Sequence, residues 1–151
     1  MARITEQLAS PATPEVAFDT LADFTTTAEW DPGIAAAERL DDGPIGLGSR
    51  FEVRSRIGLV TVPLVYEITH YERPDRLVLS TIGTFHRGED DVRFAAGPDG
   101  GTVVTWTAMF AVRGPIGRLI DPGLSVAFRR VGKAAIAGLE RFLHEQVGQR
   151  R

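Results

Sequence analysis

The stretch "GPIGLGSRFEVRSR", residues 43–56, decides how this chain folds. Its glycine cluster first suggests a phosphate-binding loop, in which backbone N–H groups at the start of a helix face the anion. The residues after the glycines alternate instead, with Phe51, Val53 and Ser55 on one face and charged residues on the other. This period of two predicts a β-strand. Because the motif also lacks the Lys-Ser/Thr pair of a nucleotide loop, we interpret the glycines as a tight loop that enters a β-sheet.

Strand patterns continue on both sides of this stretch. We expect a first strand in "RITEQLA" (3–9), and further strands in "LVTVPLVYEITHY" (59–71), "LVLSTIG" (77–83), "GEDDVRFAA" (88–96) and "TVVTWTAMFAV" (102–112). The loop "GPDGG" (97–101) predicts a hairpin between the last two. Six or seven strands between Ile34 and Val112 in hairpin order imply an antiparallel sheet.

Helical patterns flank the strands. Thr13 before Pro14 is a helix start signal, with Thr as N-cap and Pro at the first position. "TTTAEW" (25–30) predicts a second short helix, which "DPG" (31–33) ends. At the other end of the chain, Asp121 caps a predicted amphipathic helix over residues 122–146, with an apolar stripe that includes Phe128 and Val131.

Composition limits the class of protein. The 151 residues fit one domain, which we assign to 1–151. The formal charge of −3 and the mixing of Arg with acids argue against nucleic acid as a partner. The absence of cysteine excludes disulfides and thiolate chemistry. The apolar run "IGLVTVPLV" (57–65) is shorter than the ~20 residues of a spanning helix, so we expect a protein that is not membrane-embedded, is cytoplasmic, and is a monomer or homodimer.

The order strand, two short helices, antiparallel strands and a long helix predicts a container. A single helix does not fill a wide, twisted sheet, so a cavity is expected between them. The sequence also resembles the START/SRPBCC superfamily, and within it the bacterial polyketide cyclase/dehydrase and lipid-transport-like group. The resemblance covers nearly the whole chain and rests on "PATPEVAFDTLADF", "EWDPG", "GPIGLGSRFEV", "YEITHYERPDRLVL" and "GGTVVTWTAMFAVRGP". It implies an α+β helix-grip (pollen-allergen-like) fold, a curved antiparallel sheet around a long C-terminal helix with two short helices closing the cavity.

Alternate residues of each strand share the face that points to the cavity, and the apolar stripe of the helix faces the same space. These two patterns predict which residues line the cavity. Two positions have alternative interpretations: Trp30 as a plug between the short helices and the sheet or as part of the pocket rim, and Trp106 as core or as cavity wall. The predicted ligand-binding residues are Trp30, Phe51, Val53, Tyr66, Ile68, Phe94, Trp106, Ala108, Phe110, Leu124, Phe128 and Val131.

No catalytic or metal motif stands out. The three histidines are too dispersed to form a recognisable metal site, and we expect neither a metal nor another cofactor. If the chain catalyses a reaction, the candidate residues are Tyr66, His70, His86 and Asp90; alternation turns Asp90 toward the cavity as a lone carboxylate.

Three functions therefore remain open. The first is binding of a small hydrophobic molecule that is lipid-, aromatic- or polyketide-like. The second is an enzyme, a polyketide cyclase or dehydratase that acts on a ligand in the same cavity. The third is a protein-interaction module with a filled core. An apolar cavity favours binding, convergent ionisable groups favour catalysis, and a filled interior favours interaction.

Overall fold

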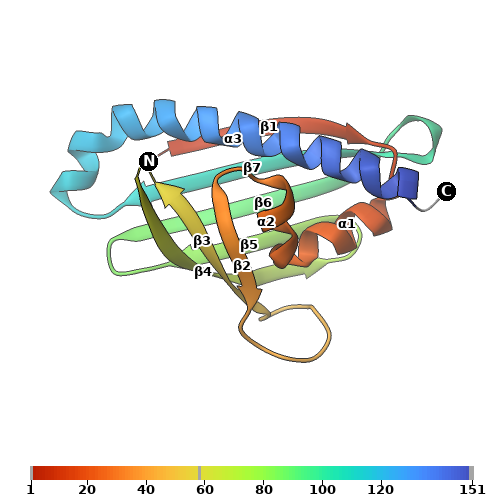
Figure 1. Cartoon of the computed structure of the whole chain (residues 1–151), viewed down its shortest axis with the longest axis horizontal. Helices are drawn as coiled ribbons and strands as arrows, with labels where there is room; N and C mark the ends of the chain where they lie inside the picture. The colour runs from red at the N-terminus through yellow and green to blue at the C-terminus, as the bar shows by residue number, and fades with distance from the viewer. Residues whose placement is uncertain (1, 58, 150–151) are drawn as a thin grey trace.

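The computed structural model describes residues 2–57 and 59–149 (Figure 1). Strands form where the sequence alternates with period two, and helices where it carries N-cap and Pro signals. Within the described residues the elements are β1 (Ala2–Ser10), α1 (Pro14–Ala22), η1 (Phe24–Thr26), α2 (Thr27–Trp30), β2 (Ile34–Arg39), β3 (Arg50–Ile57), β4 (Val60–Glu72), β5 (Arg76–Ile82), β6 (His86–Ala96), η2 (Pro98–Gly100), β7 (Thr102–Val112) and α3 (Pro115–Gln149).

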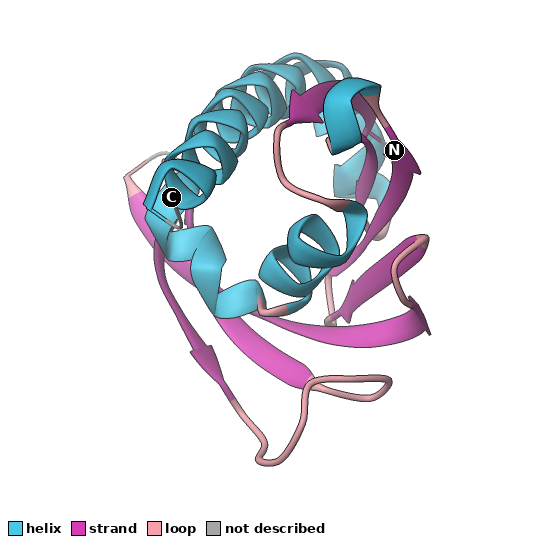
Figure 2. Ribbon diagram, turned by 90° about the vertical axis from the view of Figure 1, so that its right-hand side faces the viewer, coloured by secondary structure: helices cyan, strands magenta, loops and turns pink. Residues whose placement is uncertain are grey.

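The strands of the described chain form one seven-stranded sheet in the order β1-β7-β6-β5-β4-β3-β2, with every neighbouring pair antiparallel. Strands β2 to β7 follow chain order, whereas β1 pairs with the last strand, placing Glu6 opposite Trp106 and Ile4 opposite Ala108. Figure 2 shows the sheet curling beneath α3, with the short helices at one side. The predicted helix-grip architecture is confirmed.

The long helix begins earlier than predicted. Gly114 has a positive φ of 85°, which ends the preceding extended segment, and α3 begins at Pro115. The chain carries two proline start signals here, and the first one is used, so Pro122 lies inside the helix instead of at its first position. Among residues 2–57 and 59–149, none of the helices combines the length and apolar character that a bilayer crossing requires.

The first short helix begins as predicted. Thr13 is its N-cap and its hydroxyl accepts a hydrogen bond from the Val16 N–H at 3.3 Å, with Pro14 at the first helical position. The predicted second helix is divided into η1 and the four-residue α2, because the Asp23 side chain caps η1 by accepting from the Thr25 N–H.

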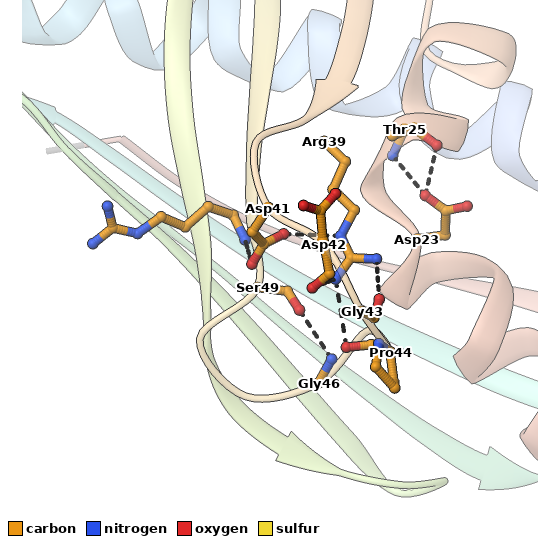
Figure 3. A network of polar contacts seen from close by, with 10 residues as sticks. Asp23, Thr25, Arg39, Asp41, Asp42, Gly43, Pro44, Gly46 and Ser49 are labelled. Carbon is orange, nitrogen blue, oxygen red and sulfur yellow. Dashed lines mark hydrogen bonds and ion pairs between the residues drawn. The ribbon is translucent and has the colours of Figure 1, made fainter.

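The loop between β2 and β3 contains the glycine cluster (Figure 3). The Arg39 guanidinium donates to the Asp41 carboxylate and to the backbone carbonyl of Gly43. Gly43 and Gly48 adopt positive φ values of 86° and 88°, which glycine accommodates without strain. A strand follows the loop, so the interpretation as a tight turn into the sheet, and not a phosphate site, is confirmed.

One end of the interior is a filled core. Phe18 of α1 lies against Tyr71 and Phe94, with ring centroids 5.1 Å and 5.2 Å apart. Leu139 and Leu143 from the C-terminal part of α3 are fully buried in the same cluster. Burying a large apolar side chain stabilises the fold by roughly 1.5–3 kcal/mol, so this end anchors the helix on the sheet.

A substitution at Gly138 tests how closely α3 crosses the end of α2. A methyl group at this position would overlap the backbone carbonyl oxygen of Trp30. Gly→Ala in an exposed helix stabilises by about 1 kcal/mol, but Gly138→Ala should lower the free energy of unfolding by about 1–3 kcal/mol because the helix must move away from α2. Urea denaturation measures this change. The control is Gly123→Ala in the same helix, which meets no atom and should stabilise; stabilisation by both variants would contradict the close crossing.

Candidate functional site

A cavity of about 320 Å³ lies between the sheet, α2 and the middle of α3. Its walls come from elements far apart in the chain, seen along the helix in Figure 2. The lining residues are mostly apolar, with a few polar groups among them. They are Ile4, Glu6, Phe24, Thr27, Trp30, Asp31, Gly33, Ile34, Val53, Ser55, Arg56, Leu64, Tyr66, Asp90, Trp106, Ala108, Phe110, Ala127, Phe128, Val131, Gly132, Ala135 and Ile136.

Aromatic rings form much of the wall. Trp30 and Trp106 meet edge to face with ring centroids 5.7 Å apart, and Phe110 stacks with Phe128 at 6.4 Å. The indole N–H of Trp30 donates to the Thr26 hydroxyl at 3.1 Å. Trp30 is only 6% exposed and also borders the cavity, so both interpretations of this residue hold at once. Trp106 lies on the cavity wall and not in the filled core.

Asp90 is a carboxylate inside the cavity. Its position on β6 gives it the same inward parity as Val92 and Phe94, both buried. Burial raises the pKa of Asp90 to about 6, because the charged form loses hydration; the charges of Asp31 and Glu89 act in the same direction. The Trp106 indole N–H donates to its Oδ1 at 2.9 Å and partly opposes this rise in pKa.

Tyr66 and Asp31 face the same space. Burial raises the pKa of the Tyr66 phenol, and the neighbouring Asp90 and Asp31 charges raise it further, so the phenol stays protonated at neutral pH. Its ring packs on Phe24 at 5.1 Å. Burial also raises the pKa of Asp31, although this carboxylate accepts a hydrogen bond from the Gly33 N–H at 2.8 Å. The arrangement combines hydrogen-bond acceptors, one phenolic donor and an acid that titrates near neutrality.

Eight of the twelve predicted ligand-binding residues line this cavity: Trp30, Val53, Tyr66, Trp106, Ala108, Phe110, Phe128 and Val131. Phe51, Ile68 and Phe94 do not; they are at most 6% exposed and belong to the filled core. They share the inward face of the sheet, but their end of the sheet is covered by α1, η1 and the last turns of α3. The side chain of Leu124 lies outside the described residues.

Two of the four candidate catalytic residues, Tyr66 and Asp90, enter the cavity, and the two histidines do not. His70 lies 3.0 Å from the Glu72 carboxylate at the exposed surface. His86 stacks on Phe110, with ring centroids 5.8 Å apart, but it is not part of the lining. No group of three metal-ligating side chains comes together in the described part of the chain.

Sequence reasoning missed three charged residues of the lining: Glu6, Asp31 and Arg56. The position of Glu6 could have been predicted, because it lies between Ile4 and Leu8 on the inward face of β1. Asp31 was interpreted only as a turn former. Arg56 was assigned to the outer face of its strand, but its guanidinium donates to the Pro32 carbonyl at 2.8 Å and thereby borders the cavity.

The family model for polyketide cyclase / dehydrase and lipid transport matches residues 1–143. The chain belongs to this family. The match covers both the filled core and the cavity, and it fits a hydrophobic ligand-binding or polyketide cyclase-like role. No curated protein matches the sequence.

Solved structures with the same fold include a START superfamily protein from Mycobacterium smegmatis, with a TM-score of 0.80, 13% identity, and coverage of 97% of this chain and 99% of that chain. TTHA0849 from Thermus thermophilus gives a TM-score of 0.78 at 19% identity, covering 93% and 96%. Ara h 8.0201 gives 0.62 at 18% identity, also covering 93% and 96%. At these identities the likeness establishes the fold alone.

The pKa of Asp90 predicts a pH-dependent stability. The folded value of about 6 lies above the ~3.9 of an unfolded Asp, so the folded state binds the proton more tightly. The contribution of Asp90 to the free energy of unfolding should therefore fall as pH rises from about 4 to about 6, by roughly 2–3 kcal/mol, and stay constant above. Comparing urea denaturation of wild type and Asp90→Asn across this range isolates the effect.

Glu38→Gln is the matched control, because Glu38 is an exposed acid on β2 whose charge is not among those that raise the pKa of Asp90. The stability difference between Asp90→Asn and wild type should grow in favour of the variant as pH rises. A difference that stays constant from pH 4 to pH 7 would show that Asp90 titrates as an exposed carboxyl.

Proposed function

We propose that this protein binds a small hydrophobic molecule in the cavity between the sheet and α3. The observation that carries the proposal is the size and chemistry of that space: about 320 Å³, walled by aromatic and aliphatic side chains with few polar groups. Ligand pockets in general are concave and largely apolar, with a small number of polar groups that fix orientation. A cavity of ~150 Å³ binds benzene, so this space of about 320 Å³ suits a ligand of two to three rings.

The middle of α3 supports this assignment. Ala127, Phe128 and Val131 border the cavity, whereas Leu139, further along the helix, packs into the filled core. The helix thus has a sealed part and an open part. A protein-interaction module with a solid interior is less well supported, because the space beneath the open part is not filled by side chains.

Catalysis is a second candidate function, and one observation favours it. Asp90 has a pKa of about 6 and lies in the same cavity as the protonated Tyr66 phenol. A carboxyl that titrates near neutrality suits general acid or base chemistry, and a phenol O–H is able to donate to a ligand carbonyl. A cyclase or dehydratase would use Asp90 to move the proton and Tyr66 to orient the ligand.

The binding proposal is tested by filling the cavity. Ala108 on β7 faces the space, and Ala108→Phe would occupy a large part of it. We expect this variant to bind the neutral fluorescent probe N-phenylnaphthylamine at least ~10-fold more weakly than wild type, at a melting temperature equal to or above that of wild type, because the ring gains apolar contacts.

Thr107→Phe is the matched control, since Thr107 points to the other face of the same strand, where its hydroxyl lies 3.2 Å from that of Thr5. Probe titration and thermal unfolding are measured for all three proteins. Unchanged probe affinity in Ala108→Phe would place the binding site elsewhere, and no binding to wild type would refute the proposal.

A further inference from the structure

Acids outnumber cations among the described residues that line the cavity. These residues include three acids, Glu6, Asp31 and Asp90, and one cationic side chain, Arg56. The Arg56 guanidinium donates to the backbone carbonyls of Pro32 and Ile34, at 2.8 Å and 3.4 Å, and forms no ion pair with these acids among the described residues. The described α3 residues in the lining, from Ala127 to Ile136, are all apolar.

We propose that the cavity selects molecules that carry a protonated amine on an apolar, preferably aromatic, body and discriminates against apolar carboxylates. This inference rests on the proposed binding function and names the ligand class of that same site.

Unused acceptor capacity gives the ammonium a place to bind. Asp90 uses Oδ1 for the Trp106 indole N–H, and within the described chain its Oδ2 has no hydrogen-bond partner. The Tyr66 hydroxyl likewise has no partner in that part of the chain, although the residue borders the cavity. Neither oxygen is fully enclosed by the described residues, so both are open to a ligand. A charged donor on that ligand forms a hydrogen bond stronger than the neutral one that water offers.

Asp31 lies near enough to Asp90 for its charge to raise the pKa of Asp90, and Glu6 lines the same cavity from β1. Glu6 on β1 lies opposite Trp106 on β7, and Asp90 on β6 lies opposite Ala108 of the same central strand. The two carboxylates therefore flank β7 from both sides, while Asp31 approaches from the end of α2. Trp106 lies between them, and a cation near an indole is attracted by the negative face of the ring.

Electrostatics separates amines from acids in this space. Asp31 raises the pKa of Asp90, which means that the two negative charges already repel each other. A ligand carboxylate adds another negative charge beside these acids, whereas an ammonium neutralises one. An alcohol of the same shape carries no charge and is expected to bind with intermediate affinity.

Three matched probes test the inference: naphthylmethylamine, naphthylmethanol and naphthoate. Calorimetric titration of wild type at pH 7 should give the tightest binding for the amine and at least ~10-fold weaker binding for the carboxylate. Asp90→Asn should weaken amine binding about 10-fold but alcohol binding less than about threefold. Glu38→Gln, at the exposed surface of β2, should leave all three affinities unchanged.

The pH dependence separates a charge effect from a change of shape. Between pH 5 and pH 7 the amine stays protonated while Asp90 ionises, so its affinity should rise in wild type and stay flat in Asp90→Asn. The other titratable groups that line the cavity are Glu6 from β1, Asp31 after α2 and Tyr66 from β4, with Arg56 of β3 as a cation. Glu89, the neighbour of Asp90 on β6, also raises the pKa of Asp90. Should Asp90→Asn fail to fold, Asp31→Asn is expected to show the same preferential loss of amine binding.

The possible outcomes are distinct. Carboxylate binding equal to or tighter than amine binding overturns the ligand class while leaving hydrophobic binding intact. Equal affinity for all three probes would also overturn the ligand class and leave hydrophobic binding intact. Failure of all three, together with failure of N-phenylnaphthylamine, refutes the proposed function itself.

Discussion

The structure depends on a mismatch of widths between a sheet and a helix. Seven strands spaced ~4.8 Å apart span roughly 29 Å, whereas one helix with its side chains is about 10–12 Å across. Curling the sheet reduces this difference but does not remove it, so α3 covers mainly β1 and β7, as Figure 1 shows. The remaining concave surface needs other cover, and α1 with η1 supplies it at only one end of the sheet. The open end is a consequence of this geometry and not of loose packing.

The two ends of the interior have different chemistry. At the filled end, Leu139 and Leu143 pack among aromatic and branched side chains, and the fold gains its stability there. At the open end the same helix carries smaller or partly exposed residues, and Asp90 and Asp31 appear among the aromatic rings. These half-buried carboxylates accept hydrogen bonds from Trp106 and Gly33, but their raised pKa values reduce stability at neutral pH, so the stability of the fold does not supply a reason for them. Binding a ligand gives them one, which connects the position of the cavity to its proposed function.

Much of the fold and part of the site were predictable from the sequence. Alternation in the strands and the proline and cap signals of the helices gave nearly every element, and inward parity placed Trp106, Ala108 and Phe110 on the wall. The alternation of a strand shows which residues face inward but not which part of the strand the helices cover. Phe51, Ile68 and Phe94 were therefore assigned to the cavity, but they lie in the filled core. That division depends on the crossing of α3 and α2 at Gly138, a contact between segments far apart in the chain. Asp31 lies in a turn, where no periodicity predicts the direction of a side chain.

The central claim is that a small apolar molecule occupies the open end of the interior. Intermolecular nuclear Overhauser effects between bound N-phenylnaphthylamine and assigned side chains locate the probe most directly. The account predicts contacts to the Trp106 indole and the Phe128 ring, and none to Phe18 or Leu143 in the filled core. Contacts confined to the outer face of the sheet, or to the filled core, would contradict it.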